Sequence, residues 1–552
     1  MSQNSGALQT DSTPAPDKRT DGQDETNIKE TIESILVAFI LAFIFRAFVV
    51  EAFVIPTGSM APTLLGAHMR YQCPDCGYTF DVNYSSRNAQ DDEDMRTPPD
   101  AFPAADVYCP NCGFHIASPQ GQSSTPSPVN YGDRILVLKY LYLMHPARRW
   151  DVVVFKSPDE PQTEHYQQNF IKRLVGLPGE RLMVLAGDIY VWNSSKSKWE
   201  IPHKTRSAQE ALWRIVYDND FHPHLLKRPS PPRWEQPWKQ DSGSGWDLTS
   251  ENGGRIFKFD NAGGEGGLTF DPNANSTTQT LSDYLVYDTG SGPGTVRQVG
   301  SIGSVDDSIN FPVADLKLVA SYTRKSGSGA FEMKLSRFED VDHTFTAQIT
   351  PDTVRLIHRT SSGEITTVEK SLAELGIRGD RPIFVEFMNV DYRVTLRLNG
   401  KDAFEPMDYE PNVPWLMDQW SLHRRGRPGE AQIDAERQTC TIEHVGLWRD
   451  VYYTNQKYEG GGPLHSATPD NPVQLGPREY FTMGDNSAIS KDARYWDAPI
   501  DLPHEGLDHV AEGRVPEQFL LGKAVFVYWP AGYRAYDHLA IIPNFGDMRW
   551  IH

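Results

Sequence analysis

The feature that most constrains the fold is an apolar run, from about Ser34 to Val50, that ends just before a turn-rich segment. The run carries one charge, Arg46, and its length lies near the lower end of the ~17–25 residues that a helix needs to cross a bilayer. An arginine near the end of such a helix can extend its guanidinium to the interface, so Arg46 does not exclude insertion. We therefore predict a transmembrane anchor over residues 28–54, with a buried core helix as the alternative.

The residues before this run argue against a cleavable secretory signal. Glu25, Glu30 and Glu33 outweigh Lys29 where a basic region would be expected. The anchor is therefore predicted to stay uncleaved. Residues 1–27 are polar and almost free of apolar side chains, which predicts a disordered tail.

Composition limits the classes of partner. The chain has 552 residues, of which 39% are hydrophobic, enough for two or three domains beyond the anchor. Its 73 acidic and 53 basic residues give a formal charge of −20, which argues against a nucleic-acid partner because phosphate binding needs a basic surface. Phosphate-binding loops, HExxH and dinucleotide fingerprints are absent from the sequence.

Four of the five cysteines form two knuckles, one at Cys73 and Cys76 and one at Cys109 and Cys112. Each pair is followed by Gly and contains Pro, so that the backbone can turn and both thiolates can reach one ion. The spacing predicts a structural zinc site with four thiolate ligands, and two disulfides are the alternative in an oxidising compartment. Cys440 is predicted to be a small buried residue.

Strand-like stretches follow the cysteines, at Asp133–Tyr140, Asp151–Lys156 and Asn169–Val175. Aliphatic and β-branched residues between Gly and Pro turns predict a mostly β domain. Lys172 lies among apolar neighbours in the third stretch. Burial would lower the pKa of its ammonium and leave a neutral amine that can act as a base, whereas a solvated strand lysine is the alternative.

Four segments in order resemble the conserved boxes of type I signal peptidases. These are Thr57–Met60 after the apolar run, Gly132-Asp133, Lys172-Arg173 with Gly176–Gly179, and Gly484–Arg494. The resemblance covers residues 34–66, 131–193 and 470–530. The last box departs from the usual pattern at Ser487, Ile489 and Ala493, none of which is a member of the expected dyad.

The resemblance implies a Ser/Lys dyad that needs no catalytic cofactor. Ser59 matches the nucleophile and Lys172 the general base. Thr57, through its hydroxyl, and Ser59, through its backbone N–H, match the oxyanion hole. The supporting residues are expected to be Ser490, Asp485, Asp492 and Arg494, and a surface turn with an ion pair is the alternative for the last box.

The implied reaction is removal of N-terminal signal peptides from translocated preproteins. The resemblance places the enzyme in the plasma membrane, single-pass and in contact with lipid, with its catalytic domain on the outer side. Two rival interpretations make other demands on the sequence. A self-cleaving repressor would need a DNA-binding domain and no anchor, and a non-enzymatic receptor would not need Ser59, Lys172 and Ser490.

A long insertion separates the second and last catalytic segments. Between about 314 and 453 it shows many short strands with turn residues between them, and the Asn399-Gly400 hairpin resembles those of the laminin G or concanavalin-like sandwiches. A glycan or a protein is the expected class of ligand for such a sandwich, and a passive insertion is the alternative. Gly-rich patches, including Gly263–Gly267 and Gly460–Gly462, are predicted to be loops.

The predicted fold class is therefore mostly β, with a signal-peptidase-like catalytic domain behind one helix. The predicted organisation is a tail (1–27), an anchor (28–54), a nucleophile segment (55–66), a four-cysteine zinc-ribbon-like insertion (67–130), a general-base segment (131–193), the insertion with the sandwich (194–469), and the final box with the C-terminal tail (470–552).

Overall fold

The computed structural model describes residues 22–84, 100–119, 125–158, 168–224, 234–241, 243–275, 281–290, 311–454, 466–502, 507–530 and 544–552. It divides into two units, Met1–Glu51 and Ala52–His552. The Gly-rich patch Gly460–Gly462 lies outside the described residues. So do residues 1–21 of the predicted tail.

The first unit contains helix α1 (Gly22–Phe48). The helix begins before residue 28, so the predicted tail is too long at its C-terminal end. Among the described residues, no helix combines the length and the hydropathy of a membrane span. The predicted transmembrane anchor is thus present as a helix but is not confirmed as a span.

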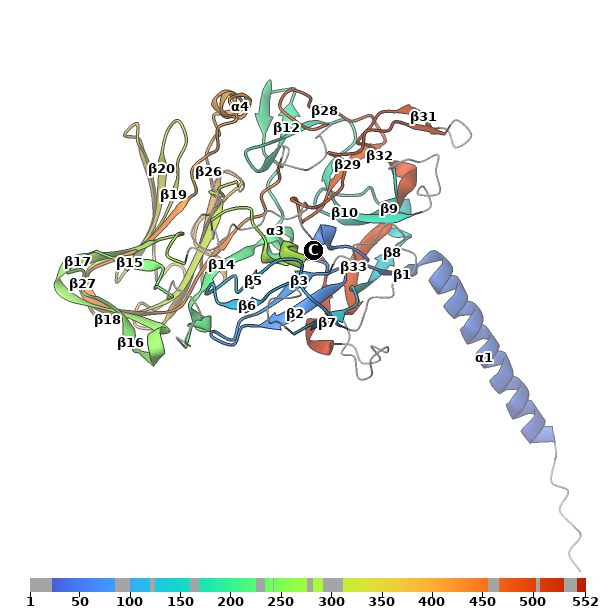
Figure 1. Ribbon diagram of the computed structural model, residues 1–552, viewed down its shortest axis with the longest axis horizontal. Coiled ribbons are helices and arrows are strands. Elements are labelled where there is room, and N and C mark those ends of the chain that lie inside the picture. Colours follow the sequence, from blue (N-terminus) through green and yellow to red (C-terminus); the bar gives the residue numbers. More distant parts are fainter. Residues whose placement is uncertain are drawn as a thin grey trace, which may run out of the picture. The chain divides into compact units, whose positions relative to one another are not determined.

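The second unit is mostly β, as predicted. The sheet that carries Lys172, a predicted dyad residue, has eight strands, drawn from both ends of the chain (Figure 1). Its order is β1 (Val50–Val54), β8 (Arg134–Leu138), β33 (Leu520–Trp529), β9 (Val152–Lys156), β10 (Asn169–Gly176), β29 (Glu479–Met483) and β32 (Val515–Pro516), with β34 (Arg549–Trp550) beside β33. Strands from both sides of the insertion therefore join in one sheet.

Smaller elements surround this sheet. A four-stranded sheet has the order β13 (Lys198–Glu200), β12 (Asp188–Asn193), β11 (Arg181–Leu185) and β28 (Val473–Gln474), and a hairpin pairs β30 (Ile500–Leu502) with β31 (Leu507–Val510). Two short helices are α2 (Leu141–Met144) and α3 (Arg206–Leu212). Thr205 accepts a hydrogen bond from Ala208 N and so caps α3.

The cysteine-bearing segment forms its own small sheets. One has the order β3 (Thr79–Asn83), β2 (His68–Gln72), β7 (Ser127–Asn130) and β4 (Asp100–Ala101), and the other pairs β5 (Val107–Tyr108) with β6 (His115–Ala117). Together they bring residues from both ends of the segment into one cluster of buried side chains.

The long insertion forms one fourteen-stranded sheet. The main order is β22 (Ile365–Ser371), β21 (Thr353–Thr360), β20 (His343–Ile349), β19 (Phe331–Arg337), β27 (Glu430–Arg449), β18 (Leu316–Gly327), β23 (Ile383–Val390), β24 (Arg393–Leu398) and β25 (Lys401–Asp402). The other members are β14 (Arg214–Asp218), β15 (Trp238–Gln240), β16 (Trp246–Glu251), β17 (Ile256–Phe270) and β26 (Met407–Asp408). Helix α4 (Val413–Ser421) follows the last of these.

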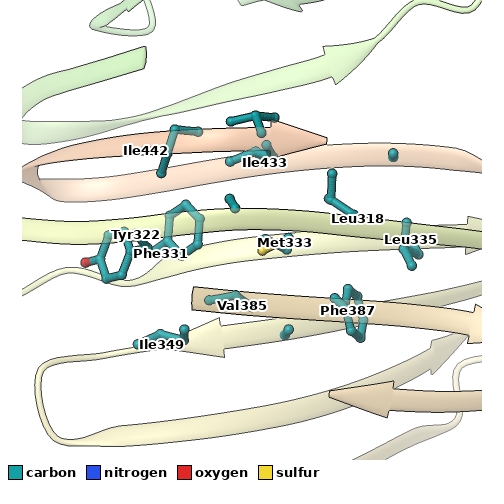
Figure 2. Packing of buried hydrophobic residues seen from close by; sticks show 14 of the residues in the cluster. Leu318, Tyr322, Phe331, Met333, Leu335, Ile349, Val385, Phe387, Ile433 and Ile442 are labelled. Carbon is teal, nitrogen blue, oxygen red and sulfur yellow. The ribbon is translucent and has the colours of Figure 1, made fainter. Parts of the chain in front are cut away.

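The insertion has a single large apolar core. Alternate residues of β18, β19, β23 and β27 point into it, among them Leu318, Phe331, Val385 and Ile433 (Figure 2). This alternation is the pattern expected of strands with one buried face. The predicted strands are therefore confirmed, and the laminin G-like topology stays a prediction.

One predicted loop is wrong. Gly263–Gly267 lies inside strand β17, which pairs with β27 through a register shift between Asn261 and Glu265. A bulge of this kind accommodates glycines in a strand, and at Gly266 a Cβ would lie 2.0 Å from Ser244 O. The glycines mark a bulge and a close backbone approach.

Candidate active site

Ser59 lies in a one-turn 3₁₀ helix, Gly58–Met60, directly after the segment that follows β1. The turn is buried, and Ser59 is 9% exposed. The backbone N–H of Asn486 donates to Ser59 O at 3.1 Å, and Asn486 Nδ2 donates to Gly58 O at 3.3 Å. The final box therefore holds the backbone of the nucleophile turn from the other end of the sequence.

Lys172 extends from the middle of β10 to this turn. Its Nζ lies 2.7 Å from Ser59 Oγ and donates to Ile171 O at 3.1 Å. β10 pairs with β9 through Lys172 and Val153 and with β29 through Arg173 and Met483, so the backbone of the lysine strand is held from both sides. The two predicted dyad residues thus meet although 113 positions separate them.

The surroundings of Lys172 favour a neutral amine. Burial lowers the pKa of its ammonium to about 8, an effect that the carboxylates of Asp492 and Asp485 oppose and the guanidinium of Arg494 strengthens. At a pH near 8 a large share of the side chain is therefore unprotonated and can accept the proton of Ser59 Oγ.

The predicted supporting residues Asp492 and Arg494 form a buried ion pair. Arg494 Nε and Nη2 each lie 2.8 Å from one carboxylate oxygen of Asp492, and neither side chain is exposed to solvent. Asp492 Oδ2 also accepts from Gly484 N at 2.9 Å. The surface-turn alternative is therefore wrong, because these side chains organise the interior of the final box.

The other supporting carboxylate, Asp485, is paired with Arg173. Arg173 Nε and Nη2 lie 2.6 and 2.7 Å from its two oxygens, in a buried bidentate ion pair. Since Arg173 follows Lys172 on β10, this pair joins the lysine strand to the final box.

Ser490, one of the expected supporting residues, is buried at the site. Within the described part of the chain, Ser490 Oγ has no hydrogen-bond partner, and Lys172 Nζ donates to Ser59 and Ile171 instead. Space at this point is tight, because a Cβ on Gly484 would lie 2.3 Å from Ser490 Oγ and 2.4 Å from Ser59 O. Glycine at 484 lets Ser490 and the nucleophile turn approach each other.

Thr57 precedes the turn in an extended conformation and is exposed. Its side chain forms no capping hydrogen bond to the 3₁₀ helix.

Ser487, where the final box departs from the usual family pattern, also has a structural account. Ser487 Oγ accepts from Arg494 Nη1 and from Thr454 N, each at 2.9 Å, so this serine helps to hold the guanidinium.

Two residues that the sequence analysis missed come from the insertion. Asp288 Oδ1 accepts a 2.6 Å hydrogen bond from Asn486 Nδ2, and a Cβ on Gly58 would lie 2.5 Å from the Tyr287 ring. Both belong to the short 3₁₀ segment Val286–Gly290. No sequence signal marks this segment, because it matches none of the catalytic boxes and its position depends on the fold of the insertion.

The four knuckle cysteines converge at one point. Cys73 Sγ lies 3.6 Å from Cys112 Sγ, Cys76 Sγ lies 3.6 Å from Cys109 Sγ, and all four sulfurs lie within 4.8 Å of one another. Zinc–sulfur bonds of about 2.3 Å place tetrahedral thiolates about 3.8 Å apart. Separations of 3.6 Å are well beyond the ~2.05 Å of a disulfide bond, so the arrangement fits one zinc ion better than two disulfides.

The two knuckles have the same backbone structure. In the first knuckle, Cys73 N donates to Tyr78 O and Gly77 N donates to Cys73 O. In the second, Cys109 N donates to Phe114 O and Gly113 N donates to Cys109 O. Gly77 and Gly113 have φ values of 79° and 68°, a region that favours glycine.

Parts of the chain match the family model of signal peptidase, peptidase S26, over residues 28–73, 111–225 and 426–529. The ranges between these matches, 74–110 and 226–425, contain the middle of the cysteine segment and most of the insertion. The matched ranges contain Ser59, Lys172 and the final box.

Signal peptidase I of Pseudomonas fluorescens is 37% identical over 86 residues, which are 15% of this chain and 26% of that protein. Probable signal peptidase I-1 of a Synechocystis species is 37% identical over 82 residues, 14% of this chain and 41% of that protein. The chain therefore spans less than half the length of these relatives. These matches support a peptidase of the signal peptidase type.

Among solved structures, the receptor-binding domain of botulinum neurotoxin D covers 40% of this chain and 45% of its own, at 9% identity and a TM-score of 0.23. A similarity this weak carries no argument about the insertion.

Proposed function

We propose that this protein is a serine endopeptidase with a Ser59/Lys172 dyad that removes signal peptides from preproteins. The observation that carries the proposal is the 2.7 Å contact between Ser59 Oγ and a buried Lys172 whose pKa is lowered to about 8. A neutral amine at this distance can take the hydroxyl proton as the oxygen attacks a carbonyl carbon.

The reaction proceeds in two steps. The proton of Ser59 moves to Lys172, Oγ bonds to the scissile carbonyl, and the leaving amine takes the proton from the ammonium as the acyl-enzyme forms. Water then gives a proton to Lys172 and attacks the ester, which releases the signal peptide and restores Ser59. Ser59 N–H and Thr57 Oγ1 are the proposed oxyanion donors.

We assign supporting roles to Ser490, Asp485, Asp492 and Arg494. The Asp492–Arg494 and Arg173–Asp485 ion pairs hold the final box and β10 in place around the dyad. Ser490 Oγ is buried beside the nucleophile turn, where substrate binding or a small shift would bring it to the lysine amine.

We further propose that α1 associates the enzyme with the plasma membrane, with the catalytic domain on its outer side. Support comes from apolar side chains on α1 that are about half exposed or more, including Ile35, Phe39 and Phe43. Carbonate extraction of membranes and protection from added protease would test the association and the side.

Structural zinc at Cys73, Cys76, Cys109 and Cys112 belongs to the same proposal. The ion would stabilise the cysteine-bearing sheets and takes no part in catalysis. A glycan or protein ligand for the insertion stays a prediction.

The dyad is tested by cleavage of a preprotein with an Ala-x-Ala site, in detergent, by the unaltered chain and by the Ser59→Ala and Lys172→Ala variants. We expect cleavage after the second Ala by the unaltered chain and none by either folded variant. The control is Ser195→Ala, which changes an exposed serine in a turn. Full activity of folded Lys172→Ala would overturn the dyad.

A further inference from the structure

A cavity of about 490 Å³ lies between the cysteine-bearing segment and the insertion. Tyr78 and Phe80 contribute from the cysteine side, and Trp213, Arg214 and Arg449 from the insertion side. Pro62, three positions after Ser59, also lines it, so the cavity lies close to the proposed nucleophile. Its size suits a small organic group or a few residues of peptide.

Two buried arginines face each other at this cavity. Arg214 and Arg449 are cross-strand partners on β14 and β27, and they are 4% and 3% exposed. In the described part of the chain their hydrogen bonds all go to backbone carbonyls: Arg214 donates to Ala211, Trp213 and Asp485, and Arg449 to Asp450 and Tyr284. Among the described residues, no carboxylate lies within ion-pair distance of either guanidinium. Two adjacent buried cations without such partners are costly unless an anion joins them.

Acidic residues near the arginine pair bond to other groups, and Asp283 Oδ1 accepts a hydrogen bond from Phe311 N at 2.8 Å. The two oxygens of Asp485 are held by Arg173, and those of Asp450 by Lys204 and Gln209. The pKa of Arg449 is lowered to about 10, mainly by burial; the charge of Arg214 acts in the same direction, and the carboxylates of Asp283, Asp450 and Asp288 oppose it. The two arginines thus lie side by side at the cavity without an ion-pair partner in the described part of the chain.

Three residues that line the cavity also have a buried polar atom without a hydrogen-bond partner in the described part of the chain. The atoms are Trp213 Nε1, Arg214 Nε and Tyr287 Oη. Two are obligate donors and the hydroxyl can donate, so an acceptor group fits this set better than a donor group.

The walls of the cavity are aromatic. Lys317 Nζ lies 4.9 Å from the Trp213 ring and 5.3 Å from the Trp448 ring, and it pairs with Glu210 at 3.2 Å. Since Glu210 already balances Lys317, the arginine pair is the part of the wall that can receive an anion. The flat apolar walls around the arginine pair favour an anionic group that is attached to an apolar or aromatic group.

We propose that this cavity binds a carboxylate carried on an apolar or aromatic body, with Arg214, Arg449 and Trp213 as its ligands. The carboxylate is either the acidic side chain of a peptide or a free organic acid. The peptide source rests on the proposed peptidase function, since an extended substrate would pass the nucleophile turn.

Binding is measured by calorimetry on the full chain carrying Ser59→Ala, so that peptides stay intact. The probes are acetyl-Phe-Glu-Phe-amide with its Gln counterpart, phenylacetate with phenylacetamide, and inorganic phosphate. We expect each acid to bind at least about tenfold more tightly than its amide, because charge-assisted hydrogen bonds form only with the acid. If the Glu peptide binds more tightly than phenylacetate, the natural ligand of the cavity is a peptide. If phenylacetate binds more tightly, the natural ligand is a free organic acid. Equal affinity of acids and amides, or tighter binding of phosphate than of any carboxylate, overturns the proposal.

Two further variants locate the site. Arg449→Gln removes one cation, and Trp213→Phe removes the indole donor but keeps an aromatic ring, so at least the second is expected to fold. Each should weaken binding of the preferred acid about tenfold, while Trp238→Phe, another buried indole whose Nε1 is unpartnered among the described residues, leaves it unchanged. Unchanged binding in folded Trp213→Phe and Arg449→Gln overturns the site. A negative result in these binding measurements does not change the outcome of the preprotein cleavage test. The cavity proposal and the dyad proposal can therefore be disproved independently.

Discussion

Lys172 sets the pH dependence expected of the proposed dyad. Burial lowers its pKa to about 8, and only the neutral amine can accept the proton of Ser59. We expect kcat/KM to increase about tenfold per pH unit below pH 8 and to level off above it. The measurement is cleavage of a synthetic preprotein between pH 6 and pH 10, with circular dichroism as the control for folding. A flat profile over this range would contradict the role of Lys172.

The same burial has a cost for stability. The pKa of Lys172 falls from 10.5 to about 8 on folding, so at lower pH the buried ammonium destabilises the fold by roughly 3 kcal/mol. Lys172→Met should therefore abolish cleavage and raise the free energy of unfolding by roughly 1–3 kcal/mol at pH 7.

This gain should shrink as pH increases from 8 towards 10.5, because the unfolded chain then loses the protons that the folded one has already lost. Urea unfolding at several pH values measures it, and Lys401→Met, at an exposed lysine, is the control. A loss of stability in Lys172→Met would show that the amine is held by favourable contacts.

At the scale of elements, the backbone of the final box at Gly484 packs closely against the turn that holds Ser59. In Gly484→Ala a Cβ would lie 2.4 Å from Ser59 O, so the turn or the box must shift. We expect kcat to fall by at least about tenfold, since such shifts misplace reacting atoms. Gly426→Ala is the control, because nothing lies within 4 Å of its added Cβ. Equal activity of Gly484→Ala and Gly426→Ala would show that the final box accommodates the added methyl group without misplacing Ser59.

The cysteine-bearing sheets are expected to depend on metal. The purified full chain should hold one zinc ion per chain, and chelation should expose reactive thiols and lower the midpoint of thermal unfolding. Metal analysis, thiol titration and thermal unfolding measure these changes, with a Cys440→Ser chain as the control for the fifth cysteine. No metal together with no reactive thiol in the four cysteines would instead indicate two disulfides.

At the scale of the whole molecule, the insertion reaches the proposed active site. Asp288 bonds Asn486, which in turn holds the backbone of Gly58 and Ser59. Asp288→Ala should therefore lower kcat about tenfold with a smaller change in KM, because the nucleophile loses its positioning. Asp380→Ala, at an exposed residue of the same insertion, is the control. Full activity of Asp288→Ala would show that the Asp288–Asn486 hydrogen bond does not position Ser59.

Much of the architecture could be predicted because strand signals are local. Alternation and turn residues located β8, β9 and β10 of the eight-stranded sheet and about half of the strands in the insertion, including β18 and β23. Strand β17 escaped prediction because its glycines look like a linker, and only pairing with β27 stabilises them in a strand. The fourteen-strand order was also beyond prediction, since pairing joins strands far apart in sequence.

By itself, the sequence determined which residues could carry the chemistry. Ser59, Lys172 and the final box stand in recognisable segments, and the two Cys knuckles have local turns that need only Pro and Gly. Tertiary structure alone decided the burial that lowers the pKa of Lys172, the ion pairs of Arg173 and Arg494, and the approach of Asp288 and Tyr287. The physical reason is that a motif depends on neighbours along the chain, whereas desolvation and packing depend on neighbours in space.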